Sequence, residues 1–283
     1  MLKKNKNKGW LKSFLIFPLI FIPQLFASVI LILLGFDLLS ISSGKIDLRT
    51  MIFLEYIMIF FMLIILYFCM KYIDKEKFMS IGLDFSGRFK EFNFGIFLGF
   101  MIMAFAFSIL IVFGEIVFDK VILNFKNIIM SIILFAGVSF YEEVIFRGYM
   151  LKNLMQSFNP QFSLFISSIV FCLIHGSNPN VNFLGLLNIF LAGYFLGISY
   201  VFTKNLWFPL ALHFSWNFFQ SLFGFNVSGL DSYSFIEFDI PQNNLFNGGE
   251  FGFESSIISI VILILGSLII WNYFKKNAPK KIK

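Results

Sequence analysis

Two adjacent carboxylates, Glu142 and Glu143, stand near the end of an apolar segment and are followed by Arg147. An ionisable group at membrane depth costs at least about 2.5 kcal/mol on insertion scales, so such groups are rare and usually functional. The two histidines of the chain, His175 and His213, also lie inside apolar segments. Carboxylates and imidazoles are the side chains that most often transfer protons near neutral pH. These residues therefore indicate proton-transfer chemistry in apolar surroundings.

The spacing of the acidic pair separates its two members. Residues three and four positions apart share a helix face, so Glu143 can pair with Arg147. Glu142 is rotated by about 100° from Glu143 in a helix of 3.6 residues per turn and faces a different space. A carboxylate paired with arginine stays ionised, whereas a desolvated carboxylate has a raised pKa that suits proton transfer. The spacing thus predicts a structural Glu143–Arg147 pair and favours Glu142 as the reacting group.

Two further apolar segments carry polar side chains at helical spacing. Phe171 and His175 lie one turn apart, with Asn178 three residues further on, and His213 and Asn217 also lie one turn apart. Phe171 has a structural interpretation as packing in a chain with 44 phenylalanines, and Asn178 has one as a partner for a helix end. Both histidines and the first glutamate of the pair lack an obvious local partner, which favours a functional role.

Membrane-spanning helices are the elements that must position these residues. The chain is 58% hydrophobic with a mean hydropathy of +0.84, well above a soluble domain. About 20 apolar residues cross the ~30 Å hydrocarbon core, and they must be helical because lipid offers the backbone no other partner. Eight apolar segments have suitable length, at about 14–35, 52–72, 93–114, 124–150, 161–177, 184–203, 206–222 and 255–273.

The expected fold is therefore an all-α integral membrane protein, a bundle of about eight transmembrane helices. It forms a single polytopic domain over 1–283, with a polar cavity between the helices that opens toward the cytoplasm. The first segment is interpreted as a retained helix, because its apolar stretch is longer than the ~7–15 residues of a signal-peptide core.

The distribution of basic residues predicts how the bundle is oriented. The segments predicted to lie inside carry most of the cations, namely Lys3, Lys4, Lys6, Lys8, Lys12, Lys71, Lys75, Lys77, Arg88, Lys90, Lys152, Lys204, Lys275, Lys276, Lys280, Lys281 and Lys283. The outer segments carry only Lys45, Arg49, Lys120 and Lys126, and the long segment 223–254 has no Lys or Arg. By the positive-inside rule both termini face the cytoplasm and 223–254 lies outside. The net charge of +6 is thus a topology signal, which argues against nucleic-acid binding.

The three polar blocks follow the pattern Glu-Glu-x-x-x-Arg, then Phe-x-x-x-His, then His-x-x-x-Asn, on successive apolar segments. They stand here as Glu142-Glu143…Arg147, Phe171…His175 and His213…Asn217. The chain resembles the CPBP (CAAX protease and bacteriocin-processing, or Abi) family of intramembrane endopeptidases. That family includes the type II CAAX prenyl endopeptidases (Ras-converting enzymes) and bacteriocin-immunity proteins. The resemblance covers about residues 130–220, taken as the catalytic core, and the other segments match only as apolar spans.

The resemblance implies hydrolysis of a peptide bond near the cytoplasmic face of the membrane. Glu142 would act as general base on a water that His175 also holds. His213 and Asn217 would donate hydrogen bonds to the developing oxyanion. The residues expected to support these groups are Glu143, Arg147, Phe171 and Asn178. No Ser or Cys lies in these blocks as a nucleophile, so attack by water is preferred to an acyl-enzyme.

The same family is also described as metalloproteases, so zinc is an alternative cofactor. A catalytic zinc usually takes three protein ligands and a water, and Glu142, His175 and His213 could provide the three. The chain has no HExxH motif and only two histidines. Water activated by glutamate is therefore the preferred mechanism, with zinc kept as the alternative.

The substrate implied by the resemblance is a peptide or a membrane-anchored, lipidated protein, processed in a CAAX-type or bacteriocin-related reaction. No residue pattern identifies a prenyl substrate. One alternative is a non-catalytic membrane protein that confers bacteriocin self-immunity or binds a partner. Another is a small transporter with a carboxylate proton relay. For a transporter we expect paired inverted halves with broken helices, and the sequence has neither.

Overall fold

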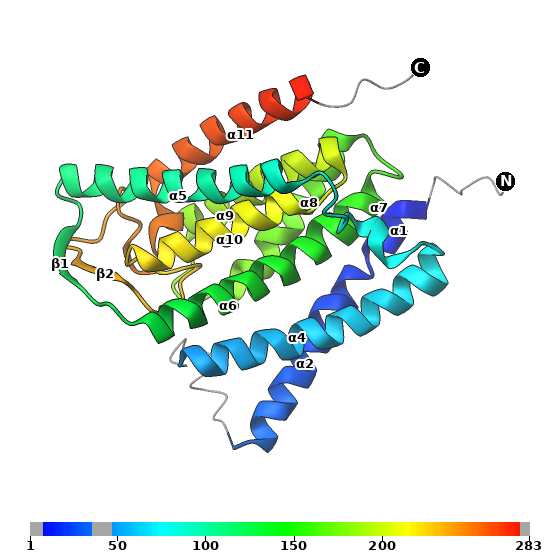
Figure 1. The fold of residues 1–283 in the computed structure, drawn as a ribbon, viewed down its shortest axis with the longest axis horizontal. Helices are drawn as coiled ribbons and strands as arrows, with labels where there is room; N and C mark the ends of the chain where they lie inside the picture. The colour runs from blue at the N-terminus through cyan, green and yellow to red at the C-terminus, as the bar shows by residue number, and fades with distance from the viewer. Residues whose placement is uncertain (1–7, 36–46, 278–283) are drawn as a thin grey trace.

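Apolar helices make up most of the structure, a computed structural model that describes residues 8–35 and 47–277 (Figure 1). The α-helices are α1 (Gly9–Ser13), α2 (Ile16–Leu33), α4 (Leu48–Phe68), α5 (Phe89–Val112), α6 (Phe125–Glu143), α7 (Lys152–Leu154), α8 (Pro160–Ile174), α9 (Phe183–Thr203), α10 (Trp207–Leu222) and α11 (Ile257–Asn277). The 3₁₀ and π turns are η2 (Cys69–Asp74), η3 (Phe78–Ile81), η4 (Val144–Leu151), η5 (His175–Ser177), η6 (Gly249–Phe251) and η7 (Phe253–Ser255). The strands β1 (Val117–Val121) and β2 (Ile236–Asp239) form a two-stranded antiparallel sheet.

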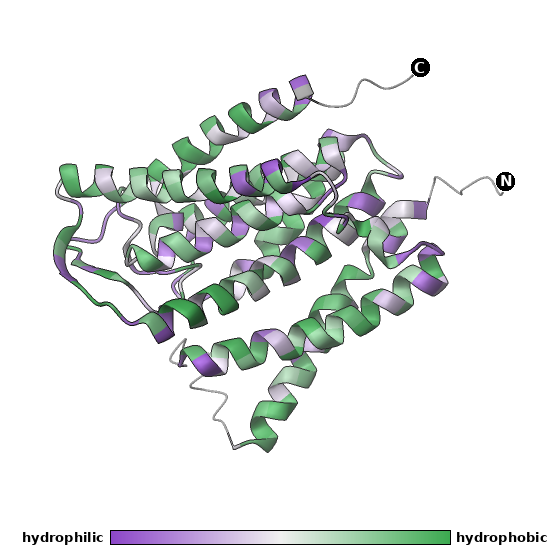
Figure 2. Ribbon diagram, viewed as in Figure 1, coloured by the Kyte–Doolittle hydropathy of each residue, from purple (hydrophilic) through white to green (hydrophobic). Residues whose placement is uncertain are grey.

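Seven helical segments of the described chain are long and apolar enough to cross a membrane, which confirms the all-α membrane architecture. They are Gly9–Leu33, Leu48–Asp74, Phe89–Val112, Phe125–Leu154, Pro160–Ser177, Phe183–Thr203 and Ile257–Lys276. The seventh predicted span, 206–222, corresponds to α10, whose 16 residues are fewer than the other seven segments have. Figure 2 shows that most residues along α2, α4 and α5 are hydrophobic, as lipid requires of a spanning helix.

Helix α10 is the central element of the bundle. It lies between α5 and α6 and also contacts α9 (Figure 1). Glycines on α5 allow the closest of these approaches, because an added Cβ would lie 2.9 Å from Ala211 Cβ at Gly95 and 2.7 Å from Ser215 Cβ at Gly99. The Ser215 hydroxyl then donates to the Ile96 carbonyl at 2.6 Å. Since α10 is enclosed by helices, it can carry polar side chains that a lipid-facing helix could not.

The connections α5–α6, α8–α9 and α10–α11 gather at one end of the bundle, where the sheet lies. Figure 1 shows the start of α1 and the end of α11 at the opposite end. The segment 223–254 contains β2, η6 and most of η7. Its Gly229 N–H donates to Phe251 O at 3.1 Å, and β2 pairs with β1 across the α5–α6 connection. The orientation of these two ends in the membrane stays a prediction, and Lys3, Lys4, Lys6, Lys45, Lys280, Lys281 and Lys283 lie outside the described residues.

Candidate active site

The acidic pair ends α6, at the point where the helix changes its winding. Glu142 and Glu143 are the last two residues of α6, and the chain continues through the π-helical turns of η4. All eight residues of η4 are buried, including Arg147. π-turns are rare and are frequent at functional sites, because they re-aim side chains that a regular helix would direct elsewhere. The change of winding therefore lies directly beside the carboxylates.

Glu143 and Arg147 form the ion pair that their spacing predicts. Arg147 Nη1 lies 2.8 Å from Glu143 Oε1, and the side chains are 1% and 0% exposed. The other nitrogen, Nη2, donates to the Gly193 carbonyl of α9 at 3.0 Å. The guanidinium carbon lies 4.7 Å from the centroid of the Phe171 ring, within the range of a cation–π contact. The pair thus ties α6 to α8 and α9, and Phe171 packs against the arginine.

His213 of α10 contacts the same glutamate. Its Nδ1 lies 2.9 Å from Glu143 Oε1, the oxygen that also accepts from Arg147. An ionised carboxylate can only accept hydrogen bonds, so the proton of this bond is on His213 Nδ1. In the neutral imidazole, Nε2 then carries a lone pair.

His175 carries its proton on Nδ1, as His213 does, but a different partner accepts it. It follows the last residue of α8, and its Nδ1 lies 2.7 Å from the Phe171 carbonyl one turn earlier. A carbonyl oxygen only accepts, so Nδ1 carries the proton and Nε2 of the neutral ring has the lone pair. The one-turn spacing therefore places the backbone carbonyl of Phe171 where it fixes the tautomer of His175.

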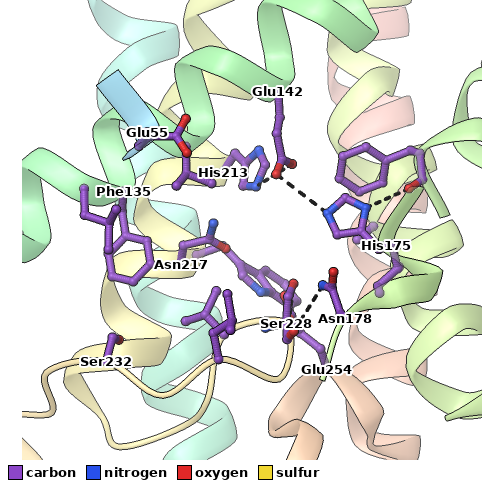
Figure 3. A pocket seen from close by; sticks show the side chains of 18 of the residues that line it. Glu55, Phe135, Glu142, His175, Asn178, His213, Asn217, Ser228, Ser232 and Glu254 are labelled. Atoms are coloured by element: carbon purple, nitrogen blue, oxygen red, sulfur yellow. Dashed lines mark hydrogen bonds and ion pairs between the residues drawn. The ribbon is translucent and has the colours of Figure 1, made fainter. Parts of the chain in front are cut away.

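Both free imidazole nitrogens face Glu142. His175 Nε2 lies 3.6 Å from Glu142 Oε1, and His213 Nε2 lies 3.8 Å from Glu142 Oε2. Figure 3 shows the carboxylate directed toward the two rings. With both rings neutral, a carboxylate and two lone pairs meet, and all three groups are hydrogen-bond acceptors. A donor must lie among them, and a water molecule suits this place because its two O–H groups can satisfy two acceptors at once.

These groups border a cavity of about 300 Å³, the lower end of the size range of small-molecule sites. Its polar lining consists of Glu55, Glu142, His175, Asn178, His213, Asn217, Ser228, Asp231, Ser232 and Glu254. Asn217 is 4% exposed and lies one turn after His213 on α10. Asn178 donates to the Ser228 carbonyl at 3.1 Å. It therefore joins the end of η5 to the segment 223–254, and its support of the reacting groups stays a prediction.

A family model described as type II CAAX prenyl endopeptidase Rce1-like matches residues 124–219. This range begins at the cap of α6 and ends within α10, so it contains all three polar blocks and the helices that bring them together. Residues 124–219, the Rce1-like segment, are therefore similar to this family. No curated protein and no solved structure matches the chain. The family description fits a site made of a carboxylate and two imidazoles inside a membrane-spanning bundle.

The zinc alternative can be tested on the side chains of the Rce1-like segment. Among the described residues, no group of three His, Cys, Asp or Glu side chains is arranged to hold a metal ion. Glu142, His175 and His213 do converge, but as they stand they do not form a metal cage. No step proposed below passes through a metal.

One carboxylate of the cavity lies outside the Rce1-like segment. Glu55 of α4 borders the cavity and is 7% exposed. Glu55 was not identified from the sequence, although it lies inside the apolar segment 52–72. An ionisable group at membrane depth is rare and usually functional, and this holds for Glu55 as it does for Glu142. The lining residues from 223–254 had no comparable signal, since neither periodicity nor a motif marks them.

The lining also bears on the side from which the cavity is reached. Val227, Ser228, Leu230, Asp231 and Ser232 border it, and they belong to the segment that the charge distribution places outside. If 223–254 lies outside, the end of the cavity that these residues border is near the outer face. The orientation of 223–254 and the opening of the cavity toward the cytoplasm both stay predictions.

Proposed function

We propose that the protein is an intramembrane endopeptidase in which water held between Glu142 and the two histidines attacks a peptide bond. The observation that carries this proposal is the convergence of His175 Nε2 and His213 Nε2 on the Glu142 carboxylate, at 3.6 and 3.8 Å. A water at this point can donate its two O–H groups to two of the three acceptors, which leaves a lone pair of its oxygen free to act as the nucleophile.

In this mechanism Glu142 is the general base. It takes one proton from the water while the water oxygen bonds to the carbonyl carbon of the substrate. His175 accepts the second O–H of the water and so fixes the direction of attack. The tetrahedral intermediate then collapses, the C–N bond breaks, and the proton on Glu142 passes to the leaving nitrogen. The products are a carboxyl group and an amine, and Glu142 returns to its ionised form.

The oxyanion needs donors, and the protonation of His213 limits which groups can serve. In its neutral form His213 donates through Nδ1 to Glu143, so its Nε2 can donate to an oxyanion only when the ring is an imidazolium. Asn217 has an amide NH₂ in either case and lines the same cavity. We therefore assign Asn217 as the principal oxyanion donor and His213 as a second donor when protonated.

The substrate class that fits is a peptide or a membrane-anchored protein, including a lipidated CAAX-type chain. The cavity combines the polar groups above with apolar side chains from α4, α6 and α9, among them Leu54, Val138 and Ala192. Such walls accept apolar residues or an acyl or prenyl chain by burial. Processing of a bacteriocin-related peptide uses the same chemistry.

A comparison of wild-type cells with a Glu142→Gln strain tests the function without knowing the substrate. Peptides from membranes and medium are identified by mass spectrometry, with the protein present at equal level. Glu237→Gln is the matched control, because it makes the same change at an exposed residue of β2. We expect cleavage products in the wild type and the control that are missing with Glu142→Gln. Identical peptide profiles, or bacteriocin immunity that survives Glu142→Gln, would favour the non-catalytic alternative.

A further inference from the structure

Glu55 is a buried carboxylate that the proposed mechanism does not use. It borders the cavity from α4 and is 7% exposed. Its Oε1 atom is buried and has no hydrogen-bond partner among the described residues. Figure 3 shows it on the wall of the cavity that also carries Phe135. An ionised carboxylate removed from water without a partner costs several kcal/mol, and a cationic ligand would offset that cost.

The backbone of α6 makes room for this side chain. A Cβ added to Gly137 would lie 3.0 Å from Glu55 Cγ, so the glycine lets the glutamate lie flat against the helix. The cavity residues around it on both helices are apolar, namely Met51, Leu54, Met58, Leu134, Phe135 and Val138. Glu55 is thus the one carboxyl group within an otherwise apolar part of the cavity wall.

The charge balance of the cavity determines what this carboxylate could bind. The described lining contains four carboxylates, Glu55, Glu142, Asp231 and Glu254, and no lysine or arginine. Glu254 Oε2 already accepts from the Ser228 N–H at 2.6 Å and from its hydroxyl at 3.1 Å. Asp231 is exposed, and Glu142 faces the histidines. Glu55 is therefore the buried carboxylate that remains for a ligand, and its partner must be a cation or a hydrogen-bond donor.

We propose that Glu55 forms a subsite for a lysine side chain of the substrate. The proposal rests on the proposed peptidase function, since it names a feature of the peptide that the same cavity accepts. A lysine has a flexible four-carbon stem and a compact ammonium group, which match an apolar wall that contains one carboxyl group. An arginine guanidinium has five donors in a fixed fork and would leave most of them unsatisfied against this wall.

Binding of n-butylamine tests the subsite without any proteolysis. n-Butylamine reproduces the end of a lysine side chain, and n-butanol is its uncharged counterpart. Thermal unfolding of the purified full chain in detergent is measured with each compound at pH 7. We expect the amine, and not the alcohol, to raise the Tm of the wild type, of Glu142→Gln and of the surface control Glu237→Gln. The increase should be absent in Glu55→Gln, which keeps the shape of the side chain without its charge. An equal increase in Glu55→Gln would overturn the proposal.

Peptide selectivity is the second test. A fluorogenic peptide is prepared with lysine at each position in turn and compared with norleucine at that position. A charge-assisted hydrogen bond predicts that the wild type prefers lysine at one position by about 10- to 100-fold in kcat/KM. The ratio of kcat/KM for the lysine peptide to kcat/KM for the norleucine peptide should fall to about one in Glu55→Gln. It should remain above one in Glu55→Asp, which keeps the carboxyl group. If Glu55→Gln lowers kcat/KM equally for the lysine peptide and the norleucine peptide, the subsite is overturned, and Glu55 is part of the reaction instead. If no peptide is cleaved, the peptidase function fails, and the amine measurement still decides on the subsite.

Discussion

Breaking the Glu143–Arg147 pair is the perturbation for which the structure gives the clearest magnitude. In Arg147→Met the side chain keeps its approximate length and loses its charge. Glu143, which is fully buried, then keeps only His213 as a partner. Removal of one member of a buried ion pair costs about 3–5 kcal/mol, because the charge that remains is uncompensated. We expect this loss in the free energy of unfolding.

The double variant Glu143→Gln/Arg147→Met separates the charge effect from the loss of contacts. It removes both charges, and replacement of both members of a buried pair is often nearly neutral in stability. We expect it to recover most of the loss and to lie within about 2 kcal/mol of the wild type. Arg88→Met is the matched control. Its pair with Glu91 has a similar length, 2.7 Å, but is partly exposed, so the expected loss is about 0.2–1 kcal/mol.

The assay is reversible unfolding in mixed micelles with increasing dodecyl sulfate, followed by tryptophan fluorescence. A loss below about 1 kcal/mol in Arg147→Met would refute the reasoning, because the pair would then act as a screened surface pair. A double variant as unstable as Arg147→Met would refute the claim that the uncompensated charge on Glu143 causes the loss. In that case the bond to the Gly193 carbonyl and the contact with Phe171, and not the charge on Glu143, would account for the loss.

Three further outcomes follow from the site. Asn217→Ala should lower kcat by about 10²–10³-fold with little change in KM, because it removes an oxyanion donor; an unchanged kcat would show that the donor is another group. Dialysis against a chelator should leave peptide cleavage intact if water is activated by Glu142 alone, and loss of cleavage that zinc restores would establish the metal alternative. A cysteine at Asp231 in a variant without Cys69 and Cys172 should react with an impermeant maleimide on intact cells, as the charge distribution predicts; labelling only after lysis would place 223–254 inside.

Local spacing made the principal site residues predictable. Glu142, His175 and His213 are ionisable groups in apolar helices, and the Glu143–Arg147 pair follows from helical geometry alone. The protonation of the histidines could not be predicted, because it depends on a backbone carbonyl in one case and on a glutamate 70 residues away in the other. Those partners are set by how α6, α8 and α10 pack.

Two other features required the folded chain. Glu55 lies on α4, and only the packing of α4 against α6 brings it to the cavity. The segment 223–254 lines the same cavity through turns and one short strand, which leave no hydrophobic period to read. The segment 206–222 was predicted as a spanning helix, and α10 occupies nearly the same residues but is shorter than the seven segments long enough to span. Apolar residues mark burial equally well whether the surroundings are lipid or other helices, so composition alone does not separate the two cases.

Glu142 and Glu143 have different roles in the proposed site, and these roles link the stability of the site to its chemistry. Arg147 pairs with Glu143, and Glu143 in turn accepts a hydrogen bond from His213 Nδ1. This leaves His213 Nε2 directed at Glu142, where the proposed mechanism places the water. A buried pair that contributes little net stability can therefore persist because it sets the tautomer and the direction of a ring that the proposed mechanism uses. It follows that Glu143→Gln should lower kcat, since an amide at this position no longer requires the proton of His213 to lie on Nδ1. An unchanged kcat would show that another group sets the tautomer.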